Sequence, residues 1–221
     1  MKRGQGQRTD LEDLQEAIKQ GESWTELSHN HFTTLAKYSK FAREYFNLVK
    51  QENVMEKLKE SLNNVELRAW QKGILDICEE EAHNRKVMWF WESEGNVGKS
   101  WMAQYLQVMK QAILLQPMKK SDMVHILSKT IHQSDIVIFD LTRSSEEGSV
   151  KVVYEVIEMI KNRHICSGKY DSDSFNFSKK HVIVFSNYAP DMSALSADRW
   201  KIVHLVGLAL SLPIVLDNTF V

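Results

Sequence analysis

The sequence predicts an α/β protein with a mainly parallel sheet and flanking helices. Three runs are apolar throughout, Val87–Trp91, Asp135–Asp140 and His181–Asn187, and segments with helical periodicity separate them. Strands that are apolar on both faces indicate a sheet covered by helices on both sides, and their alternation with helices favours parallel strands. The chain has 221 residues, which is enough for one large core and a small appended unit.

The composition is that of an ordinary folded protein, with 43% apolar residues, 26% charged residues and a net charge of −1. No global basic field indicates nucleic acid, so any such binding must come from a local cluster. The two cysteines, Cys78 and Cys166, lie far apart and match no metal or redox spacing. We therefore expect reduced thiols in an intracellular protein.

Neither end of the chain predicts a membrane segment. The first ten residues are polar and basic and lack the apolar core of a secretory signal. The longest apolar run, 202–216, falls short of the roughly 20 residues that a membrane helix needs. His204 and Pro213 also interrupt it, so we interpret it as a buried strand and a hydrophobic tail of a soluble protein.

The pattern divides the chain into a helical part and an α/β part. The predicted segments are a linker at 1–9, a helical unit at 10–50, a charged flexible linker at 51–64, an α/β domain at 65–206 and a tail of uncertain structure at 207–221. In the helical unit, Thr9 or Asp10 is a plausible N-cap, and helical spacing continues until Gly21. Two further helices are expected at 23–29 and 31–50.

The α/β part alternates helices with strands in a regular order. We expect helices at 67–81, 100–109, 121–129 and 150–162, and short strands at 113–115 and 202–206, in addition to the three long apolar runs. This order is typical of a sheet whose strands are joined by crossover helices.

The first long strand runs into a small, flexible loop that ends in Gly98, Lys99 and Ser100. In that position the backbone N–H groups would face phosphate, Lys99 would reach the β- and γ-phosphates, and the Ser100 hydroxyl would bind Mg²⁺. Ser93 stands where a glycine is usual, and Gly95 is the alternative source of flexibility. The competing interpretation is a glycine-containing turn with a surface lysine.

Asp140 closes the second strand, where a rigid strand end would deliver a metal-binding carboxylate beside the loop. The alternative is an aspartate that caps the following turn. Many enzymes that combine a phosphate-binding loop with a metal-binding aspartate carry a second acid directly after that aspartate. Leu141 occupies this position here, so the catalytic base must come from elsewhere. Glu155 and Glu158 on the next helix are the candidates, although each also fits a solvated helix charge.

Two polar residues follow later in the chain. Asn187 ends the third strand, and its amide would bind the γ-phosphate or the attacking water, unless it only starts a turn. Arg199 would stabilise transition-state charge on a neighbouring subunit's nucleotide, unless it forms a structural ion pair with Asp198 or another acid.

Between these residues lies 161–180, with five lysines and arginines against two aspartates and with interleaved aromatic rings. Cations for the backbone and rings for stacking suit single-stranded nucleic acid, and the candidate residues are Lys161, Arg163, Lys169 and Tyr170. A solvated hairpin with a small hydrophobic anchor explains the same composition.

These pieces in this order resemble the superfamily 3 helicase region of replication-initiator (Rep) proteins from circular, Rep-encoding single-stranded DNA viruses. The matching segments are GQGQRTDL at 4–11, WFWESEGNVGKS at 89–100, VIFDLTRS at 137–144, YEVIEMIKN at 154–162, GKY at 168–170, HVIVFSNYAP at 181–190 and LSADRW at 195–200. They extend over about residues 4–203.

The resemblance implies an AAA+-like P-loop NTPase with ATP and Mg²⁺ as ligands. The nucleotide loop would comprise Gly95, Asn96, Val97, Gly98, Lys99, Ser100 and Trp101. Asp140 would be the Walker B acid, Asn187 the sensor, Arg199 an arginine finger acting in trans, and Lys169 the centre of a DNA-contacting pore loop. The helical unit would be the collar of a ring-shaped homo-oligomer, for which a hexamer is expected.

The activity implied is 3′ to 5′ DNA unwinding in rolling-circle replication, in the host cell nucleus. Two other functions stay open: a superfamily 3 ATPase or RNA helicase of the type found in RNA viruses, and a non-catalytic oligomerisation and DNA-binding remnant of a Rep protein.

Two features depart from the family pattern. We expect no upstream nicking nuclease within this sequence, because His29-Asn30-His31 has a polar centre within a helical stretch and no tyrosine motif accompanies it. We interpret this histidine pair as a surface feature and expect the chain to be a fragment or a degenerate copy. The tail after Val206 also matches nothing in the family.

Overall fold

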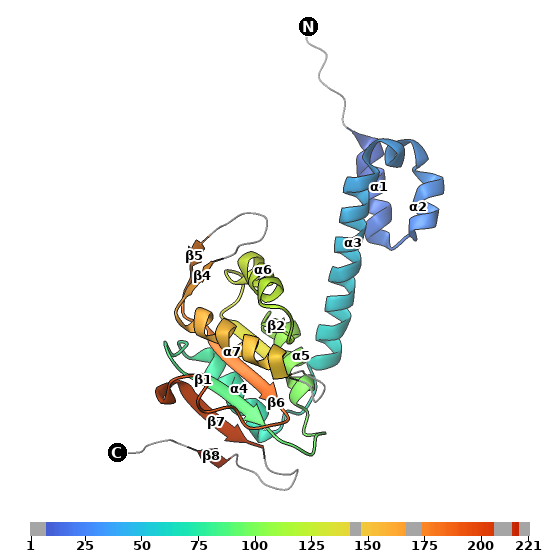
Figure 1. Ribbon diagram of the computed structural model, residues 1–221. Coiled ribbons are helices and arrows are strands. Elements are labelled where there is room, and N and C mark those ends of the chain that lie inside the picture. Colours follow the sequence, from blue (N-terminus) through green and yellow to red (C-terminus); the bar gives the residue numbers. More distant parts are fainter. Residues whose placement is uncertain (1–7, 142–146, 167–173, 206–213, 217–221) are drawn as a thin grey trace. The chain divides into compact units, whose positions relative to one another are not determined.

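A computed structural model gives the fold of the chain and describes residues 8–141, 147–166, 174–205 and 214–216 (Figure 1). The chain divides into two compact units, Met1–Asn64 and Val65–Val221. The division falls where the sequence changes from a helical to an α/β pattern. None of the helices within the described ranges combines the length and apolar character that crossing a membrane requires.

The first unit contains three helices, α1 (Thr9–Gln20), α2 (Trp24–Asn30) and α3 (Phe32–Leu62). Gly21, at φ 91°, ends α1, because this left-handed conformation is accessible to glycine without strain. The buried residues of the unit are Leu14, Ala17, Ile18, Leu27, Leu35, Ala42, Phe46 and Val49. The Trp24 ring meets Phe46 edge to face, with centroids 5.4 Å apart, and closes this small core.

The predicted linker at 51–64 is wrong for most of its length, because α3 continues without a break to Leu62. Residues 51–62 contain Glu, Lys, Gln, Leu and Met and no glycine or proline. Charged residues of this kind have high helix propensity, so a charged segment that lacks breakers favours a solvated helix over a coil. The helix departs from ideal geometry at Tyr38, where φ is −127° and ψ is 23°.

The second unit is built on a six-stranded sheet in the order β2-β3-β6-β1-β7-β8. Its strands are β1 (Val87–Trp91), β2 (Ile113–Leu115), β3 (Ile136–Asp140), β6 (His181–Ser186), β7 (Trp200–His204) and β8 (Ile214–Leu216). The first five in the spatial order are parallel, and β8 pairs with β7 in antiparallel orientation. The predicted α/β class with a mainly parallel sheet is confirmed. Of the predicted tail, only β8 lies within the described residues.

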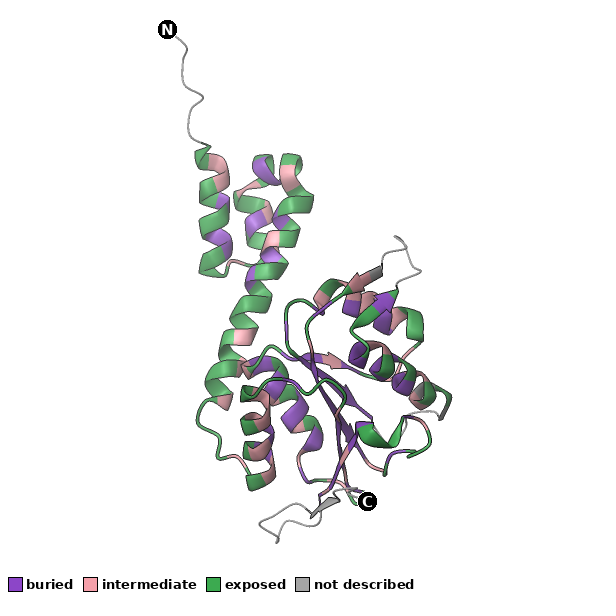
Figure 2. Cartoon of the chain, turned by 90° about the vertical axis from the view of Figure 1, so that its left-hand side faces the viewer, coloured by how far each residue is buried: buried purple, intermediate pink, exposed green. Residues whose placement is uncertain are grey.

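Helices cover both faces of this sheet. They are α4 (Ala69–Glu79), α5 (Lys99–Met109), α6 (Lys120–Thr130) and α7 (Glu147–Lys161). In β1, Val87 and Trp89 pack with residues of α6 and α7, whereas Met88 and Phe90 pack with residues of α4 and α5. The sheet is therefore buried on both sides, and Figure 2 shows its central strands as the buried interior of the unit.

A small antiparallel hairpin, β4 (His164–Cys166) and β5 (Ser174–Asn176), follows α7. It lies in the segment for which the sequence left a DNA-contacting loop and a solvated hairpin as alternatives. A hairpin is present, and the residues that join its strands, 167–173, lie outside the described part of the chain.

The central position of β6 makes its core residues a direct test of this packing. Ile183 is fully buried, so Ile183→Ala should lower the free energy of unfolding by about 2–5 kcal/mol, and Ile183→Val by only about 0.5–1.5 kcal/mol. Urea unfolding followed by circular dichroism measures both variants. Equal losses for the two substitutions would contradict a close-packed core at this position.

Candidate active site

The carboxyl ends of β1, β6 and β3 lie side by side at one edge of the sheet. Trp91 pairs with Ser186, and Asp140 pairs with Phe185, so the three strands end at nearly the same level. The loop before α5 leaves β1 at this edge, Asp140 ends β3, and Asn187 follows β6 directly. Ligands of open α/β sheets bind outside the carboxyl ends of the strands, so this edge is the candidate site.

The loop between β1 and α5 adopts the conformation that its glycines permit. Gly95 and Gly98 have φ values of 94° and 89°, and Asn96 between them has a φ of 62°. Gly98 is the N-cap residue of α5 and accepts the first helical hydrogen bond, from Met102 N–H at 2.9 Å. This places the N–H groups of a helix N-terminus at the site, where an anion is stabilised.

Helix α4 supports the loop from behind. The Arg68 guanidinium donates a hydrogen bond to the main-chain carbonyl of Val97. A Cβ atom added to Gly98 would lie 3.4 Å from the Gln71 amide nitrogen, an ordinary contact distance, so the positive φ and not a lack of space is what favours glycine here. The sequence analysis did not identify Arg68 and Gln71, because they lie outside the loop motif and no pattern links them to it.

Lys99 is the buried cation of the site, with 8% of its surface exposed. Its Nζ donates to the main-chain carbonyl of Glu92 at 2.9 Å and lies 3.4 Å from the Glu92 carboxylate. The alternative of a surface lysine in an ordinary turn is wrong, because this ammonium group points into the loop.

Glu92 is a site residue that the sequence analysis missed. Its carboxylate accepts hydrogen bonds from the Gly95 N–H at 2.7 Å and from the Glu94 N–H, and only 5% of the residue is exposed. Burial acts to raise the pKa of Glu92, but these N–H donors and the Lys99 charge outweigh it, so the pKa lies below its usual value. The residue stands in the loop itself, and its only sequence signal was an acid next to an anion-binding turn.

Asp140 and Ser100 face each other at the end of β3. Burial raises the pKa of Asp140 above its ordinary value, although a hydrogen bond with the Ser100 side chain and the charge of Lys99 act in the opposite direction. The structure thus brings Lys99, Ser100 and Asp140 together. Asn187 is half-buried at the end of β6, and Leu141 is buried.

The donor set at this edge fits Mg²⁺ in part. Within the described ranges, no group of three or more His, Cys, Asp or Glu side chains is arranged to hold a metal ion. Protein sites for Mg²⁺ with nucleotides commonly supply one or two oxygen ligands and leave the others to phosphate and water. Ser100 and Asp140 have this chemistry.

The last residue of the predicted loop, Trp101, lies in the first turn of α5. It is half-buried, and its ring centroid is 5.3 Å from that of Tyr105. Its main-chain N–H belongs to the helix N-terminus, whereas its side chain contributes to packing.

The two predicted base candidates, Glu155 and Glu158, both lie on α7. Glu155 is paired with Lys120 at 2.9 Å on the exposed surface of α6 and α7. The charge of Glu158 helps to raise the pKa of Arg85, which precedes β1 at the opposite edge of the sheet. The role of either glutamate as a catalytic base stays a prediction.

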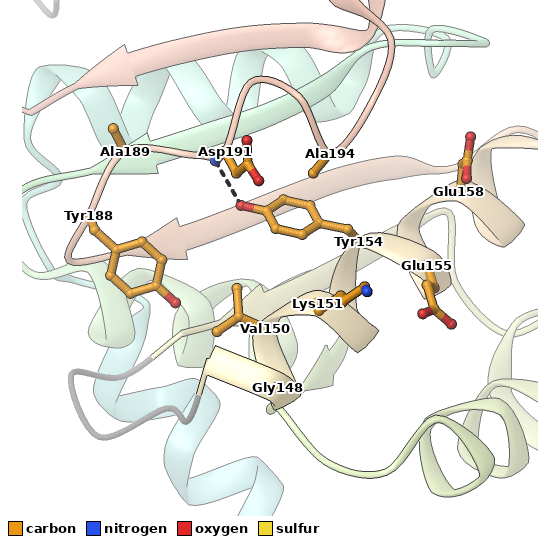
Figure 3. A pocket seen from close by; sticks show the side chains of 10 residues that line it. All are labelled: Gly148, Val150, Lys151, Tyr154, Glu155, Glu158, Tyr188, Ala189, Asp191 and Ala194. Carbon is orange, nitrogen blue, oxygen red and sulfur yellow. Dashed lines mark hydrogen bonds between the residues drawn. The ribbon is translucent and has the colours of Figure 1, made fainter.

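Both glutamates instead line a hollow of about 730 Å³ beside α7 (Figure 3). Its lining residues are Gly148, Val150, Lys151, Tyr154, Glu155, Glu158, Tyr188, Ala189, Asp191 and Ala194. The Tyr154 hydroxyl accepts a hydrogen bond from the Asp191 N–H at 3.0 Å and holds the segment after β6 against the helix. Three carboxylates against one lysine make this hollow unsuitable for phosphate.

Arg199 lies at the end of the sheet opposite the loop. It ends the short 3-10 helix η1 (Ala197–Arg199), directly before β7. Its guanidinium is 4% exposed and donates to the Asn162 side-chain oxygen at 3.0 Å, whereas Asp198 pairs with Arg85. In the single chain Arg199 is therefore buried, whereas an arginine finger must be exposed to a neighbouring subunit.

The predicted DNA-binding residues separate into three groups. Lys161 is buried, and its ammonium group donates to the main-chain carbonyls of His83 at 3.1 Å and Lys180 at 2.8 Å. Its assignment to DNA is wrong, because the lysine satisfies backbone acceptors inside the unit. Arg163 is exposed directly before β4, and Lys169 and Tyr170 lie outside the described residues.

The chain is similar to replication proteins of plant viruses and their satellites. It is 36% identical over 158 residues to Para-Rep C7 of Faba bean necrotic yellows C7 alphasatellite, with 68% of this chain and 53% of the relative covered. It is 34% identical over 150 residues to the master replication protein of Faba bean necrotic yellows virus, with 67% and 50% covered. The chain is therefore a homologue of Rep proteins of circular single-stranded DNA viruses.

The homology has a defined extent. The chain spans about half the length of the curated relatives that it matches, and Para-Rep C9 of Faba bean necrotic yellows C9 alphasatellite is a further example, with 35% identity and 48% of its length covered. No family model matches the chain. Among solved structures, NtrX from Brucella abortus aligns with a TM-score of 0.39 and 11% identity, over 85% of this chain and 50% of that one.

The burial of Lys161 predicts a measurable pH dependence of stability. Burial, together with the charge of Arg199, lowers the pKa of Lys161 from 10.5 to about 8. Between these two values the unfolded chain holds a proton that the folded chain lacks, so stability rises as the pH rises. Relative to Lys161→Met, the wild-type free energy of unfolding should increase by about 2 kcal/mol from about pH 7 to about pH 10. Denaturant titrations of both proteins across this range measure the effect, and a constant difference would contradict it.

Proposed function

We propose that this chain is the ATP-hydrolysing motor of a viral replication initiator. The observation that carries the proposal is the assembly of Lys99, Ser100 and Asp140 at the carboxyl edge of a parallel sheet, where the Ser100 side chain and the Lys99 charge both act to lower the pKa of the buried Asp140. A lysine and a hydroxyl at a helix N-terminus, facing a strand-end aspartate, are the parts that recur where nucleoside triphosphates are hydrolysed.

Each residue has a role that follows from its position. The loop N–H groups and Lys99 bind the β- and γ-phosphates, and Ser100 and Asp140 hold Mg²⁺. The ion, when bound, neutralises charge that develops on the phosphates. Asn187 follows β6, which lies between the strands that carry the loop and Asp140, and in this proposal its amide orients the γ-phosphate or a water molecule.

The relatives support a replication role, and we propose DNA as the polymer. Those named above are Rep proteins or master replication proteins, and this chain carries an exposed Arg163 and a hairpin in its basic segment. Single-stranded DNA passing the hairpin would meet the exposed cation of Arg163, and cations that contact the backbone are one part of nonspecific single-strand binding. The remaining parts of the proposal rest on family resemblance. They are unwinding from 3′ to 5′, rolling-circle replication, a hexameric ring with the helical unit as its collar, and action in the host nucleus.

One observation favours a second function, a non-catalytic remnant that binds DNA and oligomerises. Leu141 is buried where a second acid would stand, Glu155 is paired with Lys120, and the charge of Glu158 acts on Arg85. Hydrolysis without a strong base is still feasible, because positioning and charge stabilisation supply most of the rate enhancement in phosphoryl transfer. An RNA-directed motor is the third candidate, and the names of the relatives do not favour it.

ATP hydrolysis with and without single-stranded DNA separates these functions. DNA should stimulate hydrolysis more than RNA of the same length does, and Lys99→Ala should reduce the rate by roughly 100-fold or more through loss of a buried cation at the phosphates. Lys110→Ala is the matched control, since Lys110 ends the same helix and pairs with Glu79 on the surface. Equally negligible rates for the wild type and both variants would identify the remnant, and preferential stimulation by RNA would identify the RNA motor.

The position of Arg199 leads to a prediction about assembly. At the opposite edge of the sheet it cannot reach the nucleotide of its own chain, so any catalytic contribution must act on a neighbouring chain. Mixing Arg199→Ala subunits with wild type should then reduce ATPase activity more than in proportion to their fraction. Strict proportionality in the mixing curve would show that Arg199 has only a structural role.

A further inference from the structure

The loop of the candidate site already contains an anion of its own. The Glu92 carboxylate bonds to the Gly95 N–H at 2.7 Å and to the Glu94 N–H, and it lies 3.4 Å from Lys99 Nζ. The residue is 5% exposed, so this carboxylate is enclosed by the loop. It is the acid that the catalytic assignment above leaves without a role.

The partners of Glu92 include groups that a nucleotide would need. Backbone N–H groups of a phosphate loop surround the phosphates, and its lysine reaches the β- and γ-phosphates. In this chain a carboxylate engages Gly95 N–H and the lysine at the same time. The contacts of the Glu92 carboxylate with the Gly95 N–H, the Glu94 N–H and Lys99 Nζ resemble those of a bound phosphate oxygen.

We propose that Glu92 is an internal anion that competes with the terminal phosphates of a nucleoside triphosphate and thereby sets the affinity of the loop. The inference rests on the proposed function, since it assumes that the loop binds nucleotide. Two anions beside one ammonium group repel each other strongly in a site that excludes water. Nucleotide binding must therefore displace the carboxylate or tolerate its charge, and either outcome weakens binding.

The backbone limits the displacement to the side chain. The main-chain N–H of Glu92 donates to the Ser186 carbonyl at 3.3 Å and continues the pairing of β1 with β6. The Glu92 carbonyl also accepts from Lys99 at 2.9 Å, which keeps the lysine directed toward the start of the loop. Rotation of the Glu92 side chain thus frees the phosphate-binding donors while the loop backbone stays in place.

The test compares Glu92→Gln with Glu94→Gln in the full chain. Glutamine keeps an oxygen that can accept from Gly95 N–H but removes the charge, and Glu94 provides the same change of charge two residues along, on an exposed side chain. Isothermal titration calorimetry with ATP and with ADP, in the presence of Mg²⁺, gives the dissociation constants. Circular dichroism melts confirm that each variant is folded.

We expect Glu92→Gln to bind ATP roughly ten- to a hundredfold more tightly than wild type, because a like charge facing a ligand is strongly unfavourable. The gain should be smaller for ADP, which lacks the γ-phosphate. Glu94→Gln should change affinity by less than about threefold, since solvent and salt screen an exposed charge.

Different failures are distinguishable. If Glu92→Gln binds ATP with the same dissociation constant as the wild type, the inference is overturned and the proposed function stays intact. An unchanged dissociation constant with a greatly reduced kcat would instead assign Glu92 to the reacting water, and would also overturn the inference. If neither the wild type nor Glu92→Gln binds ATP or ADP, both the inference and the proposed function fail. If Glu92→Gln does not fold, Glu92→Ala replaces it, with the same expected gain.

Discussion

The pairing of β6 with both β1 and β3 is the constraint on which the rest of this structure depends. Because β6 lies between the strand that leads into the loop and the strand that ends at Asp140, the level of all three strand ends is fixed by one continuous ladder. Val182, Ile183, Val184 and Phe185 of β6 are fully buried, so neither face allows the strand to slip. A shift of one residue would turn each apolar side chain to the other face, which close packing opposes on both sides.

The electrostatics of the candidate site build on this fixed frame. Glu92 and Asp140 are both buried carboxylates near Lys99, but their pKa values shift in opposite directions. Glu92 has backbone N–H donors on its carboxylate, whereas Asp140 has the Ser100 hydroxyl and the more distant charge of Lys99. When few hydrogen-bond donors surround a buried carboxylate, a bound cation strongly stabilises its charged form. The environment of Asp140 therefore suits the proposed role of this residue as a ligand of Mg²⁺.

Much of the fold was predictable because apolar runs and helical periodicity report burial directly. The strand Val87–Trp91 was predicted to the residue, and the other two long strands differed by one residue at a single end. The end of α3 was missed because charge was taken as a sign of flexibility, whereas the segment contains good helix formers. Contacts between segments that are distant in the sequence were also not predictable. The burial of Lys161, for example, depends on the carbonyls of His83 and Lys180, which no local sequence pattern relates to it.

The candidate site was predictable to the extent that its parts follow strands. Asp140 ends one apolar strand, Lys99 follows the loop that leaves another, and parallel strands end together, so their proximity was predictable from the order of the elements. Glu92 could not be assigned from sequence because its role depends on a side-chain direction within a turn. The burial of Arg199 depends on the packing of α7 against η1, which also has no counterpart in a local pattern.

The distance between the two edges of the sheet has a mechanical consequence. The loop lies at the carboxyl end of β1 and Arg199 at the amino end of β7, and these two strands are paired along their full five residues. Neighbouring strands locked by hydrogen bonds and tight packing move as one body, since packed interiors are not continuously deformable. A local rearrangement of the loop would therefore fade before it reached Arg199, whereas tilting of the sheet as a whole would carry both edges together.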